Sequence, residues 1–369
     1  MSQIKSLVRK HIINIDPYQG GKPIEEIKRQ LGLKSVIKLA SNENSLGPSP
    51  KAIEAIKKSL SSLNRYPDSK GYYLKRKLAK YYNLEPTNFV LGNGSDELIE
   101  IIIKTFVEED ENIITADHTF LEYKIISSIK NRAVITAPLK YFKYDLNAIK
   151  KKVNSKTKVI FIANPNNPTG TYVTKYEVQD FMRDLPEDIL VVFDEAYDAF
   201  IDVDDFPVSL NYMRNRNCIV LKTFSKCYGL AGLRIGFSIS RPEFASFMEI
   251  SRQPFNVSLL AQAGAIGAID DKKFLVKTRK SVLEGKNYLY DKFKDMGLTF
   301  VPTQANFILI DVGRDGYDIF QKMLKFGVIV RDMKQYGLKN YIRVTIGNNK
   351  ENERFVKVLQ KVLKGKEKL

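Results

Sequence analysis

The amino-acid sequence predicts an α/β protein, with a large domain built on a mainly parallel, helix-covered sheet and a smaller α/β domain. Two observations carry this prediction. In the middle of the chain, short apolar runs alternate with amphipathic stretches, which is typical of strand–helix–strand crossover units. After Arg241, long helical segments and a second set of short apolar runs replace that alternation. We expect the C-terminal part and the N-terminal segment to form the smaller domain together.

The strands expected in the large sheet are short and apolar. They cover residues 88–91, 112–115, 132–137, 159–163, 189–194, 218–223 and 234–239. The helices expected among them have apolar residues at helical spacing. They cover residues 96–106, 122–130, 175–184 and 207–214.

The smaller domain is expected from the segment that follows Arg241. A helical region, interrupted near Pro254, leads into a helix, two strands and a last helix. These elements cover residues 243–296, 316–326, 327–331, 341–345 and the chain from residue 350. We therefore divide the chain into residues 1–45, as the N-terminal arm and part of the small domain, residues 46–280, as the large domain, and residues 281–369, as the small C-terminal domain.

Length and composition narrow the class of protein. The chain has 369 residues, 44% of them hydrophobic and 27% charged, which is ordinary globular composition with apolar material for a sizeable core. No apolar run approaches the roughly 20 residues of a membrane helix, and the first residues show no secretory signal. Two cysteines, Cys218 and Cys227, cannot make a disulfide framework or a four-ligand zinc site. We expect a soluble, cytoplasmic protein that has no structural metal and does not bind membranes.

The net charge of +17 raises the question of nucleic-acid binding. However, the lysines are scattered along the chain, and no helix-turn-helix, aromatic-basic RNA motif or zinc finger accompanies them. We interpret the excess as a solvated lysine-rich surface that favours anionic small ligands, and we expect no nucleic-acid partner. Only 16 of the 59 basic residues are arginines. Arginines within motifs are candidates for ligand binding, because guanidinium offers carboxylates and phosphates a planar fork.

Two turns after expected strands have residues suited to ligand binding. Residues 91–97, Leu-Gly-Asn-Gly-Ser-Asp-Glu, combine glycines with a helix start, whose free N–H groups can hold a phosphate. A plain N-capped turn would explain the same residues. Residues 164–170, Asn-Pro-Asn-Asn-Pro-Thr-Gly, make a rigid turn at the carboxyl end of a strand. Open α/β sheets bind ligands at that edge.

Two further segments place charged side chains beside apolar strands. Residues 191–197, Val-Val-Phe-Asp-Glu-Ala-Tyr, end a strand in Asp194, a carboxylate that is costly to bury without a cationic partner. A helix N-cap is the alternative interpretation. In residues 222–237, Lys226 follows a strand within a small-residue loop, and Arg234 lies further on. A lysine between apolar segments can have a lowered pKa and act as a nucleophile, although a lone lysine is more often a surface charge.

Taken in order, these segments resemble the fold-type I pyridoxal-phosphate aminotransferases. That resemblance rests on Asn-Asn-Pro-Thr-Gly, Asp-Glu-Ala-Tyr, and Ser-Lys followed by Leu-Ala-Gly-Leu-Arg-Ile-Gly. Further segments make the chain similar to the histidinol-phosphate aminotransferase family. They are residues 16–18 (Asp-Pro-Tyr), 39–44 (Leu-Ala-Ser-Asn-Glu-Asn), 64–68 (Asn-Arg-Tyr-Pro-Asp), 331–332 (Arg-Asp) and 341–347 (Tyr-Ile-Arg-Val-Thr-Ile-Gly). The resemblance extends over nearly the whole chain.

The resemblance implies pyridoxal 5'-phosphate as the cofactor, held by residues 46–280. Lys226 would bind the cofactor aldehyde covalently and later carry the proton between the substrate and the cofactor. Asp194 would keep the pyridine nitrogen protonated, and Asn167 and Tyr197 would hydrogen-bond the phenolate oxygen. We therefore expect Lys226, Asp194 and Tyr197 to be the catalytic residues. Phe120 stands where the family commonly has a tyrosine stacked on the ring.

The same resemblance assigns the cofactor phosphate to a second group of residues. They are Ser95, Asp96, Ser225 and Arg234, with Tyr66 reaching the phosphate from the partner subunit. The protein would accordingly be a homodimer with shared active sites.

Substrate recognition is implied for four residues. Arg343 would bind the substrate carboxylate, while Tyr18, Asn42 and Arg331 would lie near the amino substrate and its phosphate. The expected reaction is a ping-pong transamination in histidine biosynthesis. In it, histidinol phosphate and 2-oxoglutarate, the small-molecule amino donor and keto acid, give imidazole-acetol phosphate and glutamate.

Other functions remain open on sequence grounds. An aromatic amino acid aminotransferase and a threonine-phosphate decarboxylase share these motifs. A transcriptional regulator with an aminotransferase-like domain needs a DNA-binding module, and the enzyme-like motifs begin by Asp16. A nucleic-acid binder would show tight DNA binding that weakens steeply with salt.

Overall fold

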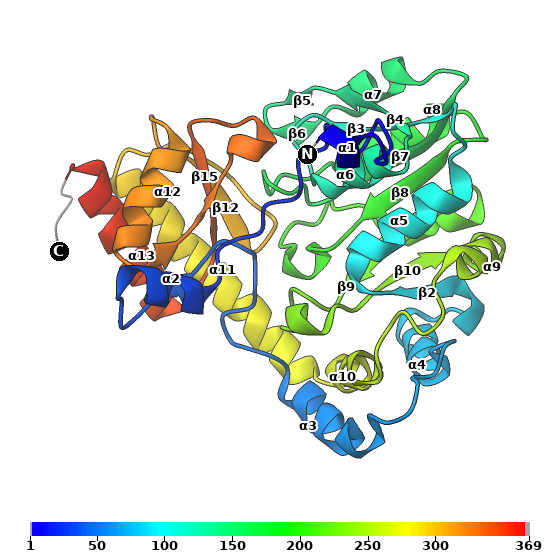
Figure 1. The fold of residues 1–369 in the computed structure, drawn as a ribbon, viewed down its shortest axis with the longest axis horizontal. Coiled ribbons are helices and arrows are strands. Elements are labelled where there is room, and N and C mark those ends of the chain that lie inside the picture. The colour runs from blue at the N-terminus through cyan, green and yellow to red at the C-terminus, as the bar shows by residue number, and fades with distance from the viewer. Residues whose placement is uncertain (1, 366–369) are drawn as a thin grey trace.

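The computed structural model describes residues 2–365 and places a large sheet at the centre of the bigger of two units (Figure 1). Within these residues the sheet has seven strands, in the order β2-β10-β9-β8-β7-β3-β4. Neighbours from β9 to β4 run parallel, whereas β10 is antiparallel to both β2 and β9. The strands are β2 (Phe89–Gly92), β3 (Asn112–Ala116), β4 (Ala133–Ala137), β7 (Thr157–Ala163), β8 (Leu190–Asp194), β9 (Cys218–Thr223) and β10 (Gly236–Ser240). The mainly parallel, helix-covered sheet predicted from the sequence is confirmed.

Helices cover this sheet and bury their apolar faces against it. They are α5 (Gly94–Phe106), α6 (Glu122–Ile129), α7 (Leu146–Lys152), α8 (Lys175–Asp184) and α9 (Pro242–Ser251). Side chains of α5 such as Leu98, Ile99 and Ile102 are fully buried in the same apolar cluster as the strands. The parallel strands read as continuous apolar runs because both of their faces are covered.

Three helices extend the larger unit at the bottom of Figure 1. They are α3 (Pro50–Ser59), α4 (Tyr72–Tyr82) and α10 (Leu259–Ile269). Two of them pack closely, because the backbone of α3 lies against Gly267 of α10, where an added Cβ would come within 2.4 Å of the Lys51 carbonyl oxygen. The sequence analysis did not predict α3 or α4.

The smaller unit has its own sheet and core. Strands β11 (Phe300–Val301), β12 (Phe307–Asp311), β15 (Tyr341–Thr345) and β14 (Arg331–Asp332) form an antiparallel sheet in that order. The helices α2 (Ile24–Leu31), α12 (Gly316–Lys325) and α13 (Asn349–Leu363) surround a second apolar cluster. The N-terminal segment contributes β1 (Ile37–Lys38), which pairs in parallel with β13 (Val328–Ile329).

The helix α11 (Lys272–Asp295) runs from the larger unit into the smaller one (Figure 1). It follows α10 directly, and its later residues Leu289 and Phe293 belong to the core of the smaller unit. Residue 280, our expected domain boundary, lies inside this continuous helix.

Three segments differ locally from the expected elements. The segment 207–214, expected as an α-helix, contains the 3₁₀ helix η4 (Ser209–Arg214). Strand β10 begins at Gly236 and not at residue 234, because Arg234 has a left-handed φ of 53°. The hairpin β5 (Leu139–Lys140) and β6 (Lys143–Tyr144) was not predicted.

No helix among residues 2–365 is long and apolar enough to cross a membrane.

Candidate active site

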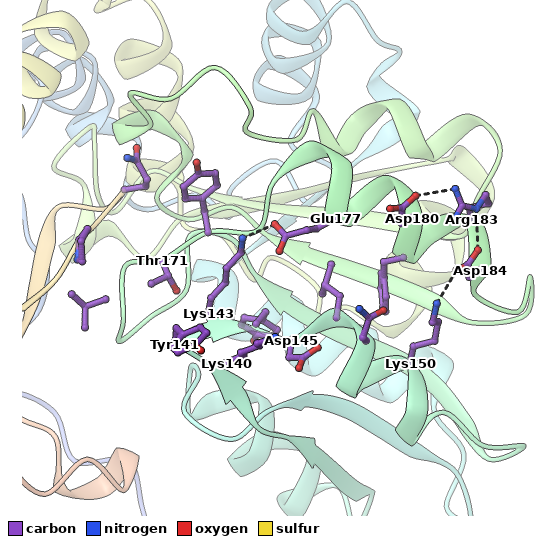
Figure 2. A pocket seen from close by; sticks show the side chains of 18 residues that line it. Lys140, Tyr141, Lys143, Asp145, Lys150, Thr171, Glu177, Asp180, Arg183 and Asp184 are labelled. Carbon is purple, nitrogen blue, oxygen red and sulfur yellow. Dashed lines mark hydrogen bonds and ion pairs between the residues drawn. The ribbon is translucent and has the colours of Figure 1, made fainter.

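A wide groove on the larger unit does not hold the predicted chemistry. It has a volume of about 810 Å³ and lies between α7, α8 and residues 301–304. Figure 2 shows that most of its charged side chains, apart from Lys140 and Asp145, are paired with one another. Lys143 Nζ lies 2.5 Å from Glu177 Oε2, and Lys150 Nζ lies 2.7 Å from Asp184 Oδ2. The groove contains none of the predicted site residues, and its paired charges leave little to attract a charged ligand.

A smaller cavity, of about 210 Å³, gathers all the predicted site residues except Tyr66 and Arg331. It opens at the carboxyl ends of β7, β8 and β9, where Ala163, Asp194 and Thr223 line it. This is the edge at which α/β sheets bind ligands. The predicted residues that line it are Tyr18, Asn42, Ser95, Asp96, Phe120, Asn167, Asp194, Tyr197, Ser225, Lys226, Arg234 and Arg343.

Lys226 stands in the loop after β9, partly buried in the cavity wall. Its Nζ donates to the carbonyl oxygen of Ser41 at 3.4 Å and lies 5.7 Å from the centre of the Tyr197 ring. Burial lowers the pKa of Lys226 to about 8, and the nearby Arg343 guanidinium acts in the same direction. The amine is therefore neutral more often near pH 7 than an ordinary lysine, as a nucleophile or proton carrier requires.

Asp194 is the last residue of β8 and is buried. Its carboxylate accepts hydrogen bonds from Tyr123 Oη at 2.7 Å and from the Ala196 backbone N–H at 3.2 Å. Burial raises its pKa to about 6. No lysine or arginine of residues 2–365 forms an ion pair with it, so a bound ligand can supply the missing cation. The helix-cap interpretation is wrong, because the next helix, η3 (Asp198–Phe200), has Tyr197 at its cap position.

One end of the cavity has groups that can bind an anion. Ser95 and Asp96 lie in the first turn of α5, where backbone N–H groups are free. Ser225 also lines this end, and Arg234 Nη2 lies 2.7 Å from Asp96 Oδ2, which orients the guanidinium. A plain capped turn does not describe this segment, since the side chain of the cap residue Asn93 makes no capping hydrogen bond.

Gly94 allows this arrangement. Its φ is +83°, and a Cβ at this position would lie 2.5 Å from Arg234 Nη2. Both the left-handed backbone and the close approach of the guanidinium require glycine.

The walls of the cavity carry aromatic and amide side chains. The Phe120 ring contacts Tyr123 edge to face, with centroids 5.6 Å apart. Tyr197 Oη accepts a hydrogen bond from Asn42 Nδ2 at 2.9 Å, and burial raises the pKa of Tyr197 to about 12. Asn167 Oδ1 accepts a hydrogen bond from Arg343 Nη1. This link was not predicted, because it joins the turn after β7 to the small sheet.

Arg331 and Arg343 face each other across neighbouring strands. They are register partners in the antiparallel pair β14–β15, and both are buried, with 7% and 4% of their surfaces exposed. Arg343 donates to the Ala40 carbonyl oxygen at 2.9 Å, and its Nε has no partner. Arg331 donates to Gln335 Oε1 at 3.2 Å. No acidic side chain of residues 2–365 forms an ion pair with either arginine.

Arg331 and Tyr66 do not line the cavity. Arg331 lies one layer behind Tyr18, whose ring centre is 5.5 Å from its guanidinium carbon. Tyr66 is 82% exposed and stacks on Phe255 with centroids 4.7 Å apart. Tyr66 therefore contributes nothing to the cavity of its own chain.

Several residues that line the cavity or contact its side chains were not predicted from the sequence. Tyr123, the hydrogen-bond donor to Asp194, comes three positions after Phe120, but nothing in the sequence marks a buried tyrosine as its partner. Ser41 and Thr223 adjoin residues that were named, so proximity in the chain was the available signal. Glu122 lines the cavity as well, and burial raises its pKa.

Together, these features define a class of enzyme. Three features meet at one edge of the sheet: a lysine with a lowered pKa, a buried carboxylate without a cationic partner among residues 2–365, and a helix start that can bind an anion. The donor set fits pyridoxal phosphate, which has an aldehyde, a basic ring nitrogen and a phosphate. The fold and the site are those of the fold-type I pyridoxal-phosphate enzymes.

Comparisons with known proteins define the family. Residues 34–359 match the family described as "Aminotransferase class I and II". The chain is 43% identical over 357 residues to "Histidinol-phosphate aminotransferase" of Moorella thermoacetica, covering 96% of this chain and 92% of that one. It is 44% identical over 365 residues to the protein of the same name from Desulfotalea psychrophila, covering 98% and 96%. The chain belongs to the class I and II aminotransferase family and is a transaminase.

A solved structure agrees with this assignment. The histidinol-phosphate aminotransferase of Sinorhizobium meliloti, in complex with pyridoxal-5'-phosphate, superposes with a TM-score of 0.90 at 27% sequence identity. The match covers 98% of each chain.

Proposed function

We propose that this aminotransferase uses pyridoxal 5'-phosphate to transfer an amino group between histidinol phosphate and 2-oxoglutarate, giving imidazole-acetol phosphate and glutamate in histidine biosynthesis. The relatives named above support this substrate over an aromatic amino acid and over decarboxylation of threonine phosphate.

The observation that carries the proposal is the cross-strand pair Arg331 and Arg343. Like charges directly opposite each other on neighbouring strands are destabilising, and burying them without acidic partners adds to the cost. Anionic ligands offset this cost when they bind in the cavity that Arg343 lines and that Tyr18 separates from Arg331. Glutamate brings two carboxylates, and histidinol phosphate brings a phosphate ester. Arg343 is placed to bind the carboxylate, and Arg331, behind Tyr18, serves the phosphate. Asn42 and Tyr18 complete the substrate side.

The cofactor residues follow from the same cavity. The start of α5 with Ser95 and Asp96, together with Ser225 and Arg234, holds the phosphate. Phe120 stacks on the ring. When bound, the cofactor supplies an electron sink for the electrons released at the substrate α-carbon.

The catalytic residues Asp194, Tyr197 and Lys226 act around that ring, together with Asn167. Asp194, which lacks a protein cation, keeps the ring nitrogen protonated. Asn167 and Tyr197 donate hydrogen bonds to its phenolic oxygen. The amine of Lys226 would carry the proton between the substrate α-carbon and C4′ of the cofactor, and its lowered pKa suits this exchange near neutral pH.

The protein acts as a homodimer whose subunits share active sites. Exposed apolar side chains that gather near α4 and α9 support this. Tyr66 stacks on Phe255, and the Lys75–Glu249 ion pair of 2.6 Å joins the two helices beside Ile250, which is 78% exposed. Such a surface is expensive to leave in water. Tyr66 then reaches the phosphate of the partner's cofactor.

Residues 1–45 and 281–369 act as the small domain and residues 46–280 as the cofactor-binding domain. A cytoplasmic location suits the two cysteines, because Cys218 and Cys227 are free and buried, as in a reducing compartment.

A half-reaction tests the proposal. Glutamate, histidinol phosphate, phenylalanine and tyrosine are added one at a time to the cofactor-loaded protein, and the absorbance of the bound cofactor is followed. Rapid bleaching by glutamate and histidinol phosphate supports it. Bleaching by phenylalanine or tyrosine without a response to histidinol phosphate would assign the protein to aromatic substrates. Release of carbon dioxide from threonine phosphate would assign it to decarboxylation.

A further inference from the structure

A buried lysine behind the active site has no part in the chemistry described above. Lys222 lies in β9, four positions before Lys226, with only 8% of its surface exposed. Its Nζ contacts two carboxylates, Glu195 Oε2 at 2.5 Å and Asp198 Oδ2. Burial alone would lower the pKa of Lys222, but the two carboxylates raise it well above its usual value, so this lysine is charged.

The strand geometry explains why these groups meet. Side chains alternate between the faces of a sheet, so Asp194 and Glu195 point to opposite sides. Asp194 is the register partner of Leu221 on β9, which places Glu195 beside Lys222 on the other face. The Glu195 backbone N–H also donates to the Leu221 carbonyl oxygen at 3.0 Å. The acid of the cavity and the acid behind it therefore sit on one rigid strand end.

The two carboxylates bracket a short turn. Residues 195–198 begin with Glu195 and end with Asp198, and Tyr197 of the cavity lies between them. One ammonium group ties both ends of this turn to β9. The same strand leads into the loop of Lys226, so the tie fixes Tyr197 and Asp194 relative to Lys226.

We propose that Lys222 is a positioning residue of the transamination site, and that its ion pairs with Glu195 and Asp198 hold the turn bearing Tyr197 against Lys226. The inference rests on the proposed function for the roles of Tyr197 and Lys226. The geometry of the tie itself does not depend on which substrate is used.

The chain offers a matched control. Lys286, on α11, is equally buried, with 9% of its side chain exposed, and its Nζ lies 2.5 Å from Asp202 Oδ2. This pair lies outside the turn of residues 195–198. Replacing Lys222 by methionine leaves two carboxylates without their cation, and replacing Lys286 leaves one, so both changes are destabilising. Only the change at Lys222 releases the turn.

The first measurement follows the exposure of Lys226 without using catalysis. In cofactor-free protein, the pH dependence of acetylation at Lys226 is read by mass spectrometry. The charged and titratable groups that face this amine include Arg343, Asp96, Tyr18, Glu43 and Tyr197, and none of them is replaced. In the parent protein we expect a midpoint near pH 8. In Lys222→Met we expect the turn of Tyr197 to loosen and water to reach the Lys226 amine, so the midpoint of its acetylation should rise. Lys286→Met should keep the midpoint of the parent protein.

The second measurement separates turnover from binding. Lys222→Met is expected to lower kcat about 100-fold, because small misplacements of catalytic groups have effects of this size. KM for glutamate changes little, because Arg331 and Arg343 lie on the small sheet. Lys222→Arg, which keeps the cation, recovers most of the lost kcat.

The outcomes are distinct. An unchanged labelling midpoint in Lys222→Met, or an equal rise in Lys286→Met, would overturn the inference. If Lys222→Met does not fold, Asp198→Asn takes its place, because this carboxylate is 36% exposed. Asp198→Asn should also raise the midpoint, by a smaller amount. The absence of a rise would overturn the inference. If histidinol phosphate is not a substrate, the half-reactions will differ from those expected, but the labelling result will be unchanged.

Discussion

Neighbouring residues in this chain have opposite environments, and Asp194 and Glu195 show this best. Glu195 meets the ammonium group of Lys222, whereas Asp194 meets only neutral donors. The raised pKa of Asp194, about 6, reflects burial without a cation. At the scale of single residues, the site is therefore prepared for a ligand that carries a positive charge at this point.

Replacing Asp194 by alanine should lower turnover by several orders of magnitude, because an unprotonated ring nitrogen is a poor electron sink. Steady-state kinetics with saturating cofactor measure the effect. Asp145→Ala serves as the control, since Asp145 caps α7 and lies outside the cavity. It should cost about 1 kcal/mol of stability with little change in rate. Near-normal turnover in Asp194→Ala would mean that the acid has only a structural role.

Replacing Lys226 by alanine should leave cofactor uptake in place but abolish the covalent link. The phosphate site at α5 does not involve this side chain, so binding persists, whereas the amine that attacks the aldehyde is gone. Borohydride reduction followed by peptide mass spectrometry checks the link. Recovery of a cofactor-labelled peptide from another lysine would contradict the assignment.

Replacing Arg343 by alanine should damage the glutamate half-reaction much more than that of histidinol phosphate, which has no carboxylate. A charge-assisted contact of this kind contributes about 1.5–3 kcal/mol, so a loss of roughly 10- to 100-fold is expected. Arg331→Ala should instead weaken the half-reaction of the phosphate ligand. Single-turnover bleaching measures each separately. Equal losses on both ligands in Arg343→Ala would indicate general disruption of the pocket.

Secondary-structure elements set the position of the anion site, and the start of α5 decides it. The helix begins at Gly94 directly after β2, so its free N–H groups lie at the sheet edge. Arg234 reaches the same point from a left-handed turn before β10. Two elements that are distant in sequence thus share one end of the cavity.

Gly94→Ala should weaken cofactor binding roughly 10-fold or more. The new methyl group displaces the Arg234 guanidinium, and the left-handed backbone adds about 1–2 kcal/mol of strain. Gly32→Ala is the matched control, since Gly32 is also left-handed, with φ +65°, but has no atom within 4 Å of the added carbon. Both variants should lose stability in thermal unfolding. Equal cofactor dissociation constants in the two would show that Gly94 affects only the backbone.

At the scale of the whole molecule, the cavity lies between two units with separate cores. The large sheet supplies Lys226 and Asp194, and the small sheet supplies Arg343. The hydrogen bond from Arg343 to Asn167 crosses between them. Changes in the relative position of the units would therefore alter the distance between Lys226 and Arg343.

Subunit mixing tests the shared site that we propose. Lys226→Ala and Tyr66→Ala subunits are each poorly active, but their heterodimer should contain one site with both residues intact. Activity should therefore rise after subunit exchange, towards about a quarter of the parent value for a random mixture. Native mass spectrometry verifies the exchange. Exchange without a gain in activity would mean that Tyr66 and Lys226 serve one subunit's site.

Local sequence patterns predict the class of fold, and together with the family resemblance they predict most residues of the cavity. Continuous apolar runs between amphipathic segments indicate buried strands with both faces covered, and polar residues at their carboxyl ends meet at one edge. Asp194 ends such a strand and Asn167 and Lys226 each follow one, and the resemblance to the aminotransferases is what grouped them at one site. The β2–β10 arrangement and the left-handed turn at Arg234 leave no such periodic signal.

The hydrogen-bond and ion-pair partners of these residues do not follow from the sequence pattern. Tyr123 binds Asp194, Arg343 binds Asn167, and Lys222 binds Glu195 and Asp198 through contacts between distant segments. Such pairs depend on strand register and on which face of an element is turned inward. A shift of one residue along a strand would move its side chains to the opposite face and separate these partners. Local sequence patterns specify the elements, whereas the pairing of buried polar groups is set by how those elements pack.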